Sequence, residues 1–81
     1  MKLFLISQSE IDDYDTYDSA VVAAETEEVA KAMNPSDGGP MAFGRNYSSW
    51  CKSLEDVKIQ YLGEAVEGTE QGVICASFNA G

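Results

Sequence analysis

The chain has 81 residues, of which fourteen are acidic and five basic, so its net charge at pH 7 is −9. This length allows one domain, residues 1–81, and leaves no room for a second hydrophobic core. The negative charge repels nucleic acids and anionic membranes at long range, and no apolar run reaches the roughly 20 residues that a membrane-spanning helix needs. We therefore expect a folded domain that binds neither nucleic acid nor membrane directly.

Four apolar segments predict strands. Leu3–Ile6 is a continuous apolar run, which is typical of a strand buried on both faces, and Ala20–Ala24 follows as a second strand. Alternation of apolar and polar residues over Val57–Tyr61 predicts a half-exposed strand. Val73–Phe78 has apolar residues on both faces of the expected strand, which predicts a central position in the sheet. The short connections favour antiparallel pairing within each pair of consecutive strands.

One helix is expected between the second and third strands. Thr26 is suited to cap it, and two glutamates follow in the first turn, where the helix dipole favours negative charge. Asn34 is suited to close the helix, and Pro35 prevents its continuation, so it spans about two turns. The segment from Ser36 to Asp56 has no clear period and is expected to be a long loop.

These elements predict an α+β domain, in the order β-β-α-long loop-β-β, in which one short helix packs on one face of a four-stranded antiparallel sheet. The other face is then wet, covered by the long loop, or covered by another copy of the chain. Phe4, Leu5, Val21 and Ile74 add more apolar surface than a two-turn helix covers. This surplus predicts a homo-oligomer.

The composition restricts the possible chemistry. The absence of histidine removes the serine–histidine and cysteine–histidine mechanisms, and two cysteines alone do not fill a zinc site. The start of the chain lacks the long apolar region and cleavage site of a signal peptide, so we expect a cytoplasmic protein with reduced thiols. Cys75, in an apolar run, is expected in the core, and Cys51 is expected to be semi-exposed. We predict a non-enzymatic protein without metal or cofactor.

The segment from Gly38 to Lys52 is the most specific candidate for a ligand site. Its aromatic side chains can stack on a base, its arginine and lysine can bind an anion, and its small polar side chains and glycines can supply hydrogen bonds. The candidate ligand-binding residues are Arg45, Asn46, Tyr47, Ser49, Trp50 and Lys52. In the alternative interpretation, Phe43, Tyr47 and Trp50 cover the small core and Arg45 pairs with a surface acid.

An acidic segment is the second candidate. Eight of the fourteen acids lie between Glu10 and Glu28. Asp12, Asp13, Asp15 and Asp18 form an acidic surface that could imitate a phosphate backbone and bind a basic protein groove. The spacing of the aspartates resembles a calcium loop only loosely, because the glycine and the closing glutamate are missing. The alternative is a solvated turn that serves solubility.

Four stretches of the sequence carry a resemblance to a known group of proteins: Met1–Ser9, Tyr14–Glu28, the pair Trp50-Cys51 and the ending Ala76–Gly81. In these stretches the chain resembles small uncharacterised proteins encoded by tailed bacteriophages. It implies a protein that acts in the cytoplasm of a bacterial host cell, and it implies no known activity. By analogy with small phage proteins that disable host factors, it suggests counter-defence, that is, immune evasion.

Three functions follow from these observations. The first is a homo-oligomeric sponge that sequesters a nucleotide-derived immune signal in a pocket built by residues 38–52. The second is an acidic mimic of nucleic acid that inhibits a host defence protein, such as a CRISPR or restriction protein. The third is a structural or virion-associated module, which no sequence feature favours. We rank the first above the second, because the acidic segment is short and is interrupted by tyrosines.

Overall fold

The computed structural model describes residues 1–8, 16–36, 38–39, 50–51 and 53–79. In chain order its elements are β1 (Lys2–Ser7), β2 (Thr16–Ala24), α1 (Glu27–Lys31), the 3₁₀ turn η1 (Leu54–Asp56), β3 (Lys58–Glu64) and β4 (Gly72–Asn79). The predicted α+β class is confirmed in its broad form: a four-stranded antiparallel sheet carries one short helix, and the fold is mainly β. Most of the predicted long loop lies outside the described residues.

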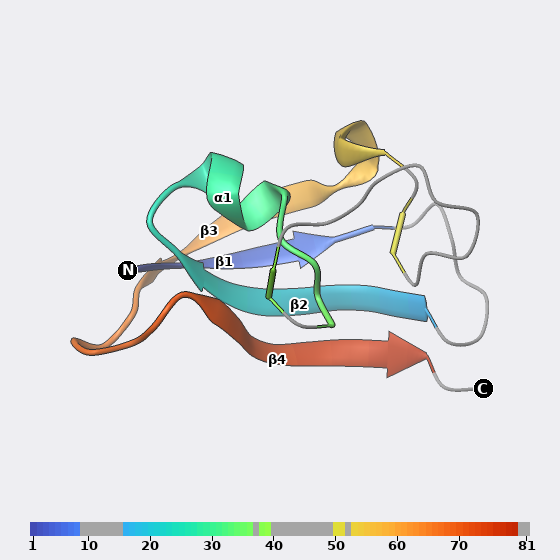
Figure 1. Ribbon diagram of the computed structural model, residues 1–81. Helices are drawn as coiled ribbons and strands as arrows, with labels where there is room; N and C mark the ends of the chain where they lie inside the picture. Colours follow the sequence, from blue (N-terminus) through green and yellow to red (C-terminus); the bar gives the residue numbers. More distant parts are fainter. Residues whose placement is uncertain (9–15, 37, 40–49, 52, 80–81) are drawn as a thin grey trace.

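The strand order in the sheet is β3-β1-β2-β4, and every neighbouring pair is antiparallel. The prediction that Val73–Phe78 is a central strand is wrong, because β4 lies at an edge. The last two strands also do not pair with each other. They occupy opposite edges, and residues 65–71 cross the end of the sheet between them (Figure 1). An uncharged edge strand and a buried central strand have the same apolar pattern in the sequence, so the pattern of Val73–Phe78 does not tell which position the strand takes.

The two central strands have one buried face. Phe4 and Ile6 of β1 are buried and lie opposite Val22 and Ala20 of β2. Leu5 is only partly buried, since it points to the other face of the sheet. The expectation that β1 is buried on both faces is therefore wrong. Every second side chain of its apolar run is buried, and the side chains between them are only partly buried.

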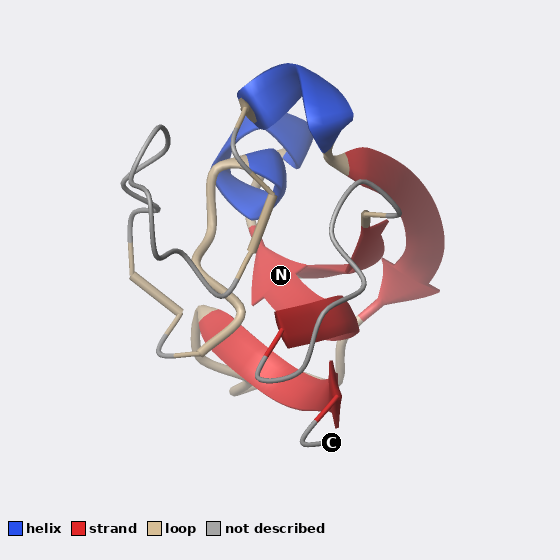
Figure 2. Ribbon diagram, turned by 90° about the vertical axis from the view of Figure 1, so that its right-hand side faces the viewer, coloured by secondary structure: helices blue, strands red, loops and turns tan. Residues whose placement is uncertain are grey.

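Helix α1 begins as predicted and ends early. The Thr26 hydroxyl accepts a hydrogen bond from the backbone N–H of Val29 at 3.3 Å, which caps the helix. The helix ends at Lys31 rather than at Asn34. α1 packs against β1, β2 and β3, on one side of the sheet, and buries Ala30 there (Figures 1 and 2).

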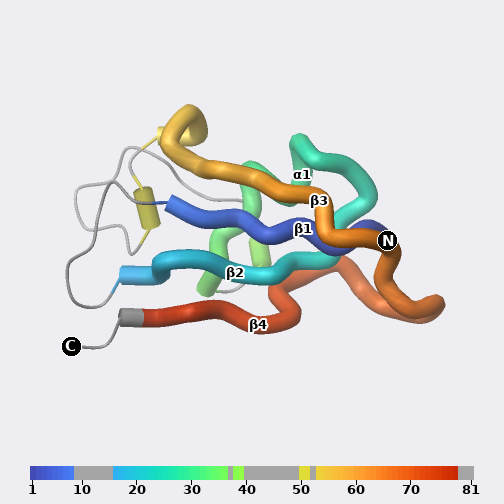
Figure 3. The backbone as a smooth tube through the Cα atoms, turned by 180° about the vertical axis from the view of Figure 1, so that it is seen from behind, coloured from blue at the N-terminus to red at the C-terminus, as the bar shows by residue number. Residues whose placement is uncertain are grey.

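The hydrophobic core fills the space between α1 and the sheet. It combines apolar side chains of β1, β2 and α1 with residues from the chain that follows the helix: Phe4, Ile6, Ala20, Val22, Ala24, Ala30, Met33, Trp50, Cys51 and Val57. Trp50 is the largest fully buried side chain, with 0% of its surface exposed. The opposite sheet face, seen in Figure 3, is not covered by α1.

A tight turn after α1 places residues 38 and 39 beside the sheet. The Asn34 side-chain oxygen accepts hydrogen bonds from the backbone N–H and the hydroxyl of Ser36, at 2.9 and 2.8 Å. The backbone carbonyl of Asn34 accepts a hydrogen bond from the N–H of Gly38 at 2.8 Å, and the N–H of Asn34 donates one to the carbonyl of Gly39 at 2.7 Å. Gly38 has a φ of +79°, and a Cβ atom there would lie 3.3 Å from the Cα of Gly72. The turn therefore requires glycine for its conformation and for its close approach to β4.

Replacement of Gly38 by alanine is expected to destabilise the fold by about 1–3 kcal/mol. Alanine is strained at this positive φ, and its methyl group would also crowd the backbone of Gly72. Gly68→Ala is the matched control, since Gly68 has a φ of +90° and open space around it. Urea denaturation followed by circular dichroism should show a larger loss for Gly38→Ala than for Gly68→Ala. Equal losses would show that the close approach to β4 contributes nothing.

Candidate functional site

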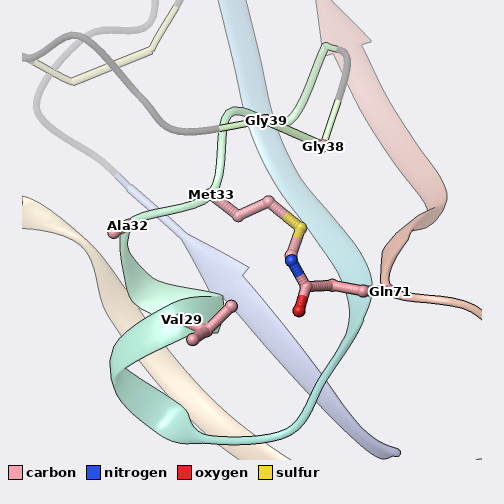
Figure 4. Close-up of a pocket in the computed structure, with 6 residues that line it drawn as sticks. All are labelled: Val29, Ala32, Met33, Gly38, Gly39 and Gln71. Carbon is pink, nitrogen blue, oxygen red and sulfur yellow. The ribbon is translucent and has the colours of Figure 1, made fainter.

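A cavity of about 260 Å³ lies between α1, the turn at Gly38 and Gly39, and the residue that precedes β4 (Figure 4). Three separate parts of the chain supply its walls: Val29, Ala32, Met33, Gly38, Gly39 and Gln71. The capped helix and the Asn34 turn hold two of these walls in place. The cavity therefore lies where the predicted ligand segment, residues 38–52, begins.

The described residues that line this cavity are uncharged, and their side chains are apolar apart from the amide of Gln71. The side chains of Met33 and Gln71 point toward one another (Figure 4). Gln71 offers both a donor and an acceptor, and Met33 is an adaptable apolar side chain. The volume lies just below the range of about 300–1,000 Å³ that is typical of ligand pockets. These dimensions suit a small group, such as one planar ring, rather than a whole dinucleotide.

The predicted ligand residues fall mostly outside the described part of the chain. Arg45, Asn46, Tyr47, Ser49 and Lys52 lie there, and their predicted role stays a prediction. Trp50 is described and lies in the core, with no exposed surface. A base cannot stack on this indole unless the side chain first leaves the core, so its position agrees with the alternative interpretation that it packs in the interior.

The two cysteines exchange their expected places. Cys51 is fully buried, and its thiol donates a hydrogen bond to the carbonyl of Ser53 at 3.4 Å. Cys75 is exposed on β4. Both expectations were wrong: the segment around Trp50 enters the core, whereas the apolar run of β4 forms an edge.

The predicted acidic site is described only at Asp18, because Asp12, Asp13 and Asp15 lie outside the described residues. Asp18 accepts a hydrogen bond from the Ser77 hydroxyl at 3.4 Å. Other acids gather at the opposite end of the sheet, where β2 and β3 end: Glu25, Glu27, Glu28, Glu64, Glu67 and Glu70. Sequence reasoning missed this grouping, since it arises only when β2 and β3 both pair antiparallel with β1, so that Ala24 and Glu64 both lie opposite Lys2.

An aromatic pair lies near this acidic end. The rings of Phe4 and Tyr61 meet edge to face, with centroids 5.7 Å apart, beside a shallow hollow that Lys2 and Glu27 also line. The Tyr61 hydroxyl donates a hydrogen bond to the Glu64 carboxylate at 2.6 Å. This bond raises the pKa of Tyr61 above its ordinary value, because the carboxylate holds the phenolic proton.

Within residues 1–8, 16–36, 38–39, 50–51 and 53–79, no three cysteine or acidic side chains are grouped so that they could hold a metal ion. No helix in that part of the chain has the length and apolar character needed to cross a membrane.

Comparison of the chain with protein-family models, with curated proteins and with solved structures found no match. The geometry of the described residues therefore carries the functional argument.

Trp50→Ala is expected to lower the free energy of unfolding by about 3–5 kcal/mol, because it removes the largest buried side chain. That loss is comparable with the whole stability of a marginal domain. Val66→Ala, at an 81% exposed position, is the control and should stay within about 0.5 kcal/mol of the parent. Urea denaturation measures both, and a loss below about 1 kcal/mol for Trp50→Ala would contradict the placement of the indole in the core.

Proposed function

We propose that this protein is a non-enzymatic binding protein that captures a small molecule in the cavity between α1 and the turn at Gly38 and Gly39. The observation that carries the proposal is the cavity itself, since its apolar and uncharged lining lies at the start of the segment with the chain's only arginine and tryptophan. An apolar hollow with a few polar groups is the usual form of a small-molecule site.

The ligand proposed is a nucleotide-derived signal. The size of the cavity supports insertion of the base alone, with the Gln71 amide as its hydrogen-bonding partner. The neighbouring charges disfavour a phosphate inside the cavity, because Glu28 and Glu70 flank two of the lining residues in the sequence. The phosphates would instead lie outside the cavity against Arg45 and Lys52, whose guanidinium and ammonium groups suit them.

Such binding would serve counter-defence in the cytoplasm of a bacterial host. The support is the resemblance to small bacteriophage proteins, together with a cavity of the size that one ring of a nucleotide needs. Sequestration requires no catalytic group: it needs only affinity and enough protein to lower the free concentration of the signal.

Ala32→Leu is expected to weaken ligand binding at least tenfold, because the larger side chain fills part of the cavity. The probes are nucleosides, nucleoside monophosphates and cyclic dinucleotides, with affinity measured by isothermal titration calorimetry. Ala65→Leu is the matched control, since it makes the same change at a half-buried alanine outside the cavity. The proposal is overturned if the parent protein binds none of the probes below about 1 mM, or if Ala32→Leu and Ala65→Leu bind equally well.

The acidic-mimic function is the second candidate, and the grouping of six glutamates at one end of the sheet favours it. These carboxylates outnumber Lys2 at the same end, so this end is net negative and complementary to a basic surface. The partner would be a host defence protein with a basic groove.

Simultaneous Glu67→Gln and Glu70→Gln should weaken binding to a basic nucleic-acid-binding protein and should reduce the salt dependence of that binding. Binding of a DNA-binding nuclease, measured by surface plasmon resonance at two salt concentrations, tests this. Glu55→Gln with Asp56→Asn in η1, at the other end of β3, is the charge-matched control. Equal weakening by both pairs would reduce the acidic end to a general charge effect.

A further inference from the structure

Strand β4 is apolar and yet exposed. All five residues from Ile74 to Phe78 are exposed, with Ile74 at 53% and Phe78 at 44%. β4 pairs with β2 along one edge, and none of the other described strands pairs with its second edge. The main contacts of α1 are with the other three strands, so the helix does not cover β4 (Figure 1). An edge strand of this kind presents unpaired backbone donors and acceptors to any strand that approaches.

The charge pattern indicates what approaches. Of the four described strands, β4 alone has no charged residue, whereas Lys2 lies in β1, Asp18 in β2, and both Lys58 and Glu64 in β3. Charged side chains are the usual protection of an edge strand, and β4 lacks them. A second copy of a chain with a net charge of −9 is repelled by most of this surface. It can approach most closely through the strand that carries no charge.

We propose that β4 pairs antiparallel with β4 of a second copy, so that two chains form one continuous eight-stranded sheet. A two-fold axis perpendicular to the sheet makes this contact self-complementary, since each strand offers the other the same sequence. A foreign protein would instead be expected to meet the acidic parts of this chain with a basic surface. The inference is independent of the ligand proposed for the cavity.

The pairing also extends an apolar row across the sheet face that α1 does not cover. Register places Leu5, Val21 and Cys75 side by side on β1, β2 and β4. They line a shallow hollow of about 190 Å³. In the dimer the row of one chain continues into that of its partner, because an antiparallel pair keeps each face on the same side. Two exposed Cys75 thiols then face each other or lie diagonally, with Cβ atoms about 5–8 Å apart.

Sedimentation equilibrium tests the proposal with two variants. Gln60 and Cys75 lie in the same row of the sheet, at opposite edges, and both are exposed. The parent protein should have twice the 8.8 kDa mass of one chain. Cys75→Lys should raise the dimer dissociation constant at least tenfold, because two lysines then meet across the axis, and Gln60→Lys should leave it unchanged. A monomeric parent, or a dimer that Gln60→Lys weakens as much as Cys75→Lys, overturns the proposal.

A second experiment does not depend on a charged substitution. A thiol crosslinker with a span of about 8 Å should join two parent chains through Cys75, since Cys51 is fully buried. The double variant Cys75→Ser with Gln60→Cys moves the exposed thiol to β3, at the far edge of the sheet. The crosslinker should then leave the two chains of the dimer unlinked. Crosslinking of the moved thiol but not of Cys75 would place the contact at the other edge and contradict the proposal. If the parent is monomeric alone and β4 pairs only with a strand of a host protein, the proposal is also wrong.

Discussion

Burial of the Trp50 indole against one face of the sheet is the interaction on which the rest of the structure depends. A helix of five residues, α1, is too short to cover the apolar face that β1 and β2 present. The chain completes the cover with Trp50, Cys51 and Met33, all of which belong to the same buried cluster. Because a chain of this length buries only a modest share of its surface, one aromatic side chain of this size accounts for a large part of the core.

This way of covering the sheet decides where the other features lie. The segment that begins at Gly38 and Gly39 and ends at Trp50 is attached at both ends, first by the Asn34 turn and then by the core. The cavity forms at the first attachment, between the turn and α1. The helix packs against β1, β2 and β3, and the indole belongs to the core cluster that includes β1 and β2, whereas β4 stays exposed at the edge. Thus the ligand site and the dimer contact that we propose lie on different parts of one small domain.

The sequence predicted the elements well and their environment less well. The Thr26 cap and the alternation in β3 are local signals, so the helix start and that strand could be located. The edge position of β4 could not, because strand order depends on how residues 65–71 cross the sheet, and no local pattern encodes that crossing. Cys75 was misplaced for the same reason, whereas Cys51 was misplaced because the segment around Trp50 enters the core.

The candidate site was predicted in part. The glycines at 38 and 39 were included in the ligand segment, and both line the cavity. Val29, Met33 and Gln71 also line it, and none of them was among the predicted ligand-binding residues. A cavity is formed by segments that meet only after folding, and no periodicity within one segment predicts such a meeting.

Hydrogen exchange of the Trp50 indole N–H, followed by NMR spectroscopy, tests this account most directly. If the indole holds the core together, this proton should exchange only through global unfolding, with the same opening free energy as the slowest backbone amides of β1 and β2. Exchange within seconds, while those amides remain protected, would show that Trp50 leaves the core by local opening. The indole would then be available to a ligand, and the claim that its burial organises the fold would be wrong.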